Sequence, residues 1–234
     1  MILNPYRFSA AGPANPGTTN LVSYFSMEEA SGNLIDSEGS NDLTVSGTVT
    51  YSTTGKVDDC LDFGTNAAGT NTTSTGVNLT GDISLSFWLN ADVVESGDLA
   101  RFAGVGETEA TNALWFVNFA SGGDMIVGHE HDAGVNQLKT WDTNLAADTW
   151  YHLAMVRDAT ALTWTLYVDG SAFGTPYTYT KNANGGASAD LVLGYSQAAY
   201  DGQLDEFAIF NDVLSADEVS WLYNSGSGRA YREL

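Results

Sequence analysis

The chain has 234 residues, and its 29 acidic side chains against eight basic ones give a formal net charge of −21. Nucleic acids and anionic membranes bind clustered Lys and Arg, so neither is an expected partner. A single cysteine, Cys60, excludes an internal disulfide. No stretch approaches the roughly 18 apolar residues of a membrane span, and no signal peptide opens the sequence. We therefore expect a soluble protein without a recognisable secretion signal.

The first 20 residues differ in composition from the rest. Three of the four prolines lie here, and Ser9–Asn20 has no apolar periodicity, which indicates an extended N-terminal arm. The tip of the arm is apolar and aromatic. It suggests docking on a partner, and the alternative is a disordered terminus. The docking residues would be Ile2, Leu3, Tyr6, Arg7 and Phe8.

From Leu21 onward, short segments of period-two alternation are separated by turn-forming residues. In residues 82–93, Ile, Leu and Phe alternate with Ser, Trp and Asn, a period of two that predicts a β-strand. Residues 149–158 are apolar on both faces and predict a central strand, joined to the strand 162–169 by a tight turn. Further strands are expected at 21–27, 56–63, 99–105, 113–119, 124–130, 136–141, 190–195 and 203–211.

One helix is predicted near the C-terminus. Ser215 and Glu218 form a capping box at its start. Val219, Leu222 and Tyr223 make its apolar stripe, and Gly226 or Gly228 ends the helix. Many short strands with regular turns and a single helix are typical of an all-β sandwich or barrel.

Several motifs resemble the laminin-G-like, concanavalin A-like jelly-roll superfamily. They are the opening LVSYFSMEEASG (21–32), the loop DSEGSND (36–42), ISLSFW (83–88), WYH (150–152) with LYVDG (166–170), LG (193–194), YDGQLDE (200–206) and LS (214–215). The resemblance implies an antiparallel two-sheet jelly roll over residues 21–226. The arm 1–20 and a tail 227–234 flank it. Arm and domain together also resemble virion proteins of tailed bacteriophages.

The resemblance further implies one structural Ca²⁺, which prefers oxygen ligands held in loops. The implied ligands are Glu28 or Glu29, Asp36, Asn41 and Asp205. Asp205 and Glu206 are expected to face opposite ways on a strand, so that only one of them can be a ligand. The alternative is that these acids are turn formers on a very acidic surface.

Three histidines offer a weaker metal signal. His129 and His131 share one face of a strand and could form half of a Zn²⁺ or Cu²⁺ site, but no third ligand is identifiable. We favour an exposed strand end for this pair. His152 matches a structural histidine of the superfamily, which implies a hydrogen-bonded core role.

An enzymatic function is not expected. Glycosidases of this fold carry Glu-x-Asp-x-x-Glu on one strand, whereas Phe-Ala-Ile-Phe follows Asp205-Glu206 here. Glycan binding through exposed aromatic faces stays open, with core packing as the alternative for each ring. Trp115 is one such aromatic, and the residues favoured for glycan binding are Trp141, Tyr177, Tyr179 and Tyr195.

The sequence thus favours a non-enzymatic virion surface protein. In this interpretation the arm binds capsid or tail proteins, and the lectin-like domain decorates the particle or binds host glycans. A homo-oligomer is expected. A free-standing carbohydrate-binding or adhesion module is the second hypothesis, and a glycoside hydrolase is the third and least favoured.

Overall fold

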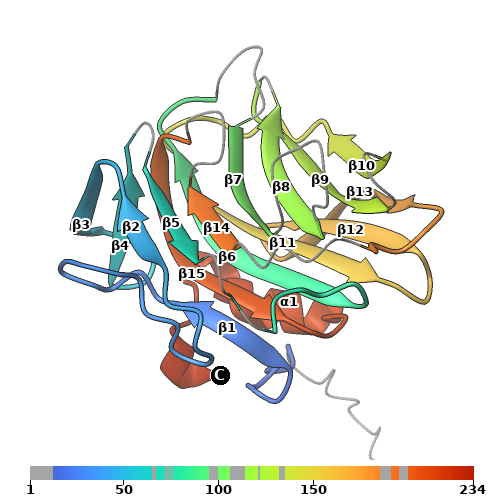
Figure 1. Cartoon of the computed structure of the whole chain (residues 1–234), viewed down its shortest axis with the longest axis horizontal. Coiled ribbons are helices and arrows are strands. Elements are labelled where there is room, and N and C mark those ends of the chain that lie inside the picture. Colours follow the sequence, from blue (N-terminus) through green and yellow to red (C-terminus); the bar gives the residue numbers. More distant parts are fainter. Residues whose placement is uncertain are drawn as a thin grey trace, which may run out of the picture.

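The alternating strands pair into two antiparallel sheets that stack face to face (Figure 1). The computed structural model describes residues 13–64, 67–71, 74, 76–94, 100–105, 114–120, 122–131, 135–184, 191–194 and 200–234. The docking residues of the arm and Tyr195 lie outside this part of the chain. The described helices are too short and too polar to cross a lipid bilayer.

The eight-stranded sheet is built around β6 (Ile83–Ala91) and β15 (Gly202–Phe210), two long strands that pair with each other along most of their length. In spatial order it contains β13 (Ser171–Thr178), β12 (Thr163–Val168), β11 (Tyr151–Asp158), β6 (Ile83–Ala91), β15 (Gly202–Phe210), β4 (Asp59–Phe63) and β3 (Val49–Thr54), and β1 (Leu21–Phe25) also pairs with β15.

The seven-stranded sheet lies over it. Its spatial order is β10 (Val135–Trp141), β9 (Asp124–His131), β8 (Trp115–Ala120), β7 (Ala100–Val105), β14 (Leu191–Gly194), β5 (Ala68–Asn71) and β2 (Thr44–Ser46). Large side chains from the two inner faces fill the space between the sheets, among them Phe87, Trp115, Trp164 and Phe207. Burial of these rings supplies the main apolar driving force for the fold.

A second apolar layer covers the outer face of the eight-stranded sheet. Helix α1 (Ala216–Tyr223) buries Val219 and Leu222 there against residues of β1, β11 and β15. Short turns η1 (Asn224–Gly226) and η2 (Tyr231–Glu233) follow the helix. The last residues continue this layer, because the Tyr231 ring lies 5.0 Å from that of Tyr24. Residues 227–234 therefore pack on the sandwich.

The all-β jelly-roll prediction is confirmed, as is the capping box, in which Ser215 and Glu218 bond each other's backbone N–H groups. The expected central strand 149–158 corresponds to β11, which lies between β6 and β12. Strands β2, β3, β5 and β13 are not among the expected ranges, because they are rich in Thr, Ser and Gly. Their apolar alternation is too weak to identify them.

Candidate functional site

A β-bulge in β15 places two neighbouring acids on the same face of the sheet. Asp205 pairs with Trp88 and Ala208 with Ser86, so Glu206 and Phe207 both stand opposite one residue of β6. Glu206 is the extra residue, with a left-handed φ of 53°. The prediction that Asp205 and Glu206 face opposite ways is wrong, because it assumed unbroken alternation.

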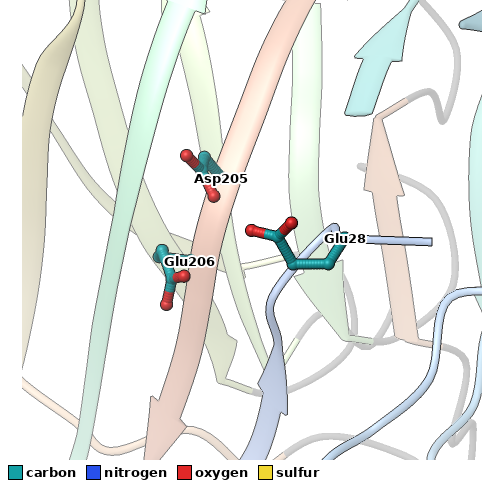
Figure 2. A group of neighbouring side chains, drawn as sticks. All are labelled: Glu28, Asp205 and Glu206. Atoms are coloured by element: carbon teal, nitrogen blue, oxygen red, sulfur yellow. The ribbon is translucent and has the colours of Figure 1, made fainter. Parts of the chain in front are cut away.

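Glu28 completes a cluster of three carboxylates. It lies in the segment after β1, and Figure 2 shows its side chain reaching toward Asp205 and Glu206 on β15. One carboxylate oxygen from each residue lies within 4.8 Å of the others. Asp205 is fully buried and Glu206 is 5% exposed, whereas Glu28 lies at the surface. The cluster is thus open on one side only.

The turn between β3 and β4 donates hydrogen bonds to this cluster. The backbone N–H groups of Lys56 and Val57 donate to Oδ2 of Asp205 at 2.7 and 2.9 Å, and Asp59 N–H donates to Glu28 at 3.1 Å. Gly55 is needed in this turn, since a Cβ there would lie 2.7 Å from Oδ2 of Asp205.

Burial opposes ionisation of all three acids. It raises the pKa of Asp205 to about 7, against the lowering effect of backbone hydrogen bonds from Val57, Lys56 and Glu206. It raises the pKa of Glu206 to about 9, although Arg232 acts in the opposite direction. The pKa of Glu28 is raised by burial and by neighbouring acids. Three carboxyl groups at this spacing cannot all ionise without a compensating positive charge.

A hard divalent cation fits this arrangement. Oδ1 of Asp205 and Oε2 of Glu206 are buried and have no hydrogen-bond partner among the described residues. Carboxylate oxygens are the ligands that Ca²⁺ prefers, and a bound ion would offset most of the negative charge of the ionised cluster. Glu28, Asp205 and Glu206 are the residues able to hold it.

Asp36 and Asn41, two other predicted calcium ligands, lie in a different polar cluster. The buried Asp36 carboxylate accepts five hydrogen bonds, from Ser23 Oγ and from the N–H groups of residues 24, 38, 39 and 41, at 2.8 to 3.2 Å. Asn41 donates its amide to Ser23 Oγ at 2.7 Å. Asp36 therefore organises its own loop by hydrogen bonds.

Glu29 is also directed away from the cluster of Glu28. Its Oε1 accepts a hydrogen bond from Ile35 N–H at 2.8 Å. Of the predicted ligands, the structure brings together Glu28 and Asp205 and adds Glu206. The sequence signal that could have identified Glu206 is two consecutive acids inside an otherwise apolar strand.

Beside Glu206 lies a small, partly open pocket of about 10 Å³ that is also lined by Ser86 and His152. Ser86 Oγ and His152 Nε2 are 2.9 Å apart, and burial lowers the pKa of His152 to about 3. A cavity of this size holds about one water molecule. Ser86 is 3% exposed and His152 is 1% exposed, so His152 has the buried, hydrogen-bonded role expected for it.

The pair His129 and His131 lies inside the sheet, so the expected exposed strand end is wrong. Both are buried. Nδ1 of His129 accepts a hydrogen bond from Trp164 Nε1 at 3.1 Å, and its Nε2 lies 2.9 Å from Lys181 O. Both ring nitrogens of His129 are therefore occupied by protein atoms, which leaves neither for a metal ion.

Most of the aromatic residues considered for glycan binding are in the core. Trp115 is fully buried, Trp141 is 4% exposed and Tyr179 is 1% exposed, so none of these rings offers a free face. Tyr179 also donates its hydroxyl to Asn182 Oδ1 at 2.7 Å. Tyr177 on β13 packs against the main core but is only partly buried, and it is the least buried of the described candidates.

Solved structures that resemble this one include receptor-binding domains of botulinum neurotoxins. The botulinum neurotoxin C/D mosaic domain aligns with a TM-score of 0.71 and 12% identity over 88% of this chain and 50% of that one. The type G domain aligns with a TM-score of 0.65 and 16% identity over 88% and 51%. A third structure is that of botulinum neurotoxin type C, whose cell entry is described as dependent on interaction with two ganglioside molecules. It aligns with a TM-score of 0.69 and 12% identity over 88% of this chain and 51% of that one.

At these identities the likeness shows the fold, and the chain spans about half the length of the domains it matches. No curated protein matches the sequence. A family model does match, over residues 63–220, which is about two thirds of the chain. The chain belongs to the concanavalin A-like lectin/glucanases superfamily.

Proposed function

We propose that the protein is a non-enzymatic, virion-associated surface protein whose lectin-like sandwich binds host glycans and carries a structural Ca²⁺. The observation that carries the binding role is the fold. Over 88% of its length the chain follows the sandwich of receptor-binding domains, one of which is described as using gangliosides, a class of glycolipid. The virion role is supported by the resemblance of arm and domain to phage virion proteins.

Burial of the acids supports a non-enzymatic role. A glycosidase needs two carboxyl groups that reach a sugar from opposite sides of the scissile bond. Asp205 and Glu206 lie beneath the turn 55–58, and Glu206 lines a cavity for one water molecule. No polysaccharide fits there, so a glycoside hydrolase stays the least favoured alternative.

Tyr177 provides the sharpest test of glycan binding. After glycan-array screening has identified a ligand, Tyr177→Ala is expected to weaken its affinity about tenfold, because the sugar loses an aromatic stacking face. Tyr167→Ala is the matched control. Tyr167 is also half-buried, but it packs on the outer face of the same sheet with the second apolar cluster. Isothermal titration calorimetry would measure both variants.

Equal binding by Tyr177→Ala and the wild type would remove this edge of the sandwich as the glycan site. If no glycan on the array binds, the proposed role is reduced to decoration of the particle without glycan recognition. Immunogold labelling of purified particles tests the virion role separately. Glycan binding without labelled particles would favour the free-standing carbohydrate-binding module instead.

A further inference from the structure

Strand β10 is an unprotected sheet edge. Among the described residues it pairs with β9 alone, in unbroken register along its whole length. The other strands that end a sheet are shielded. Strand β13 contains Pro176 and an irregular register, β3 has a register shift between Thr50 and Thr53, and β2 has only three residues. The free edge of β1 is bonded by the loop that follows it, through Asp36 and Ser37. Natural sheets use such devices to prevent edge-to-edge pairing, and β10 has none of them.

The side chains of β10 are unusually apolar for an exposed edge. Val135 is 44% exposed and Leu138 is 41% exposed, and they are two of the four large apolar side chains that lie exposed in the described part of the chain. Trp141 at the end of the strand is buried, and Thr180 donates two hydrogen bonds to Gln137 Oε1 at 2.8 and 3.0 Å. These contacts fix the strand, so its open edge is preorganised for pairing.

The distribution of charge favours a second copy of the chain as the occupant of this edge. The chain has 29 acidic residues, yet none lies in residues 135–141, and Lys139 is the one charged group in the strand. For a molecule with a net charge of −21, approach of a second copy is opposed by repulsion over most of the surface. Along this strand, which carries no acid, that repulsion is weaker.

We propose that two copies of the chain associate through β10, antiparallel about a twofold axis at Leu138. In this register Leu138 faces Leu138 of the second copy, and Gln137 faces Lys139 in both directions. No like charges stand opposite each other, and the exposed leucines bury one another. The two seven-stranded sheets then continue across the interface.

Sedimentation velocity over a concentration series tests this dimer. The wild-type chain is expected to move from a mass of 24.8 kDa toward twice that value as its concentration rises. Leu138→Asp places two carboxylates in direct opposition, and Leu138→Lys places two ammonium groups there. Each variant alone is expected to stay monomeric, and an equimolar mixture of the two is expected to restore the dimer.

The mixture separates loss of pairing from loss of folding, because two misfolded variants would not rescue each other. Ile35→Asp is the control, since Ile35 is 48% exposed but lies outside β10, and it should dimerise like the wild type. A wild-type chain that stays monomeric at all concentrations would overturn the proposal. So would an Asp and Lys mixture that fails to associate, or a dimer that disappears on removal of residues 1–12, since the arm would then be the occupant.

Discussion

Addition of Ca²⁺ to the chelator-treated protein is expected to raise its unfolding temperature. An ion at about a hundred times its Kd stabilises the folded state by about 3 kcal/mol, or roughly 6–12 °C for a domain of this size. The gain arises because the ion pairs with two buried oxygens that otherwise have no partner, on Asp205 and Glu206. Differential scanning calorimetry with and without EGTA measures it.

The effect of Ca²⁺ should grow with pH. Without the ion the folded protein holds protons that the unfolded chain releases, since the pKa values of Asp205 and Glu206 are raised from 3.8 and 4.5 to about 7 and about 9. The free energy of unfolding therefore falls as pH rises from about 4 toward 9. Ca²⁺ binds the ionised form and displaces these protons, so its stabilisation is larger at pH 8 than at pH 5.

Glu206→Gln separates the ion from other effects of calcium. The neutral amide is expected to remove most of the calcium response and to make the chelator-treated protein more stable than the wild type at pH 8. Glu29→Gln is the matched control, because Glu29 bonds Ile35 N–H outside the cluster, and it should keep the full response. An unfolding temperature that does not change with Ca²⁺ in the wild type would show that the three acids share protons instead of an ion.

Asp36→Ala is expected to destabilise the protein by about 4 kcal/mol with or without Ca²⁺. The change removes the acceptor of five hydrogen bonds, two of them donated by the buried N–H groups of Tyr24 and Asn41. Hydrogen bonds to a charged acceptor contribute about 1.5–3 kcal/mol each, and those that share one carboxylate add less than their sum. Urea unfolding in Ca²⁺ and in EGTA measures the loss under both conditions.

Asp42→Ala is the control for this loop. Asp42 is exposed and accepts one bond, from Asp36 N–H at 2.9 Å, so its loss should cost about 1 kcal/mol. Equal calcium responses in Asp36→Ala and the wild type are expected. If Asp36→Ala abolished the response while Glu206→Gln kept it, the ion would belong in the loop 36–42, as the family resemblance implied.

The fold was predictable from the sequence because its long strands alternate cleanly. Residues 83–91 show the period-two pattern of a strand, although β6 is buried on both faces, and the capping box at Ser215 marks the start of α1. The candidate site was predictable only in part. Glu28 and Asp205 come from the expected motifs, but Glu206 joins them through one extra residue in β15, and nothing in a local pattern reports a bulge that depends on pairing with β6.

Asp36 illustrates the opposite error. An acidic, glycine-containing loop has the composition of a calcium loop and also of a loop closed by a carboxylate that accepts backbone N–H groups. Composition does not distinguish them, and only the fold shows that Gly39 lets its backbone approach the Asp36 carboxylate, where a Cβ would lie 2.6 Å from Oδ2. The same limit applies to Trp141 and Tyr179, whose burial depends on the partner sheet.

The packing of the C-terminal residues distinguishes one corner of the sandwich from its opposite side. Asn15 Nδ2 donates to Glu233 O at 3.0 Å, so the segment that enters β1 and the end of η2 lie side by side at one corner of the sandwich. Strand β10 lies at the far side of the molecule from this corner (Figure 1). Any support that holds the protein at this corner would leave the β10 edge pointing outward. Dimers formed there would bridge neighbouring anchor points and leave the attachment itself undisturbed.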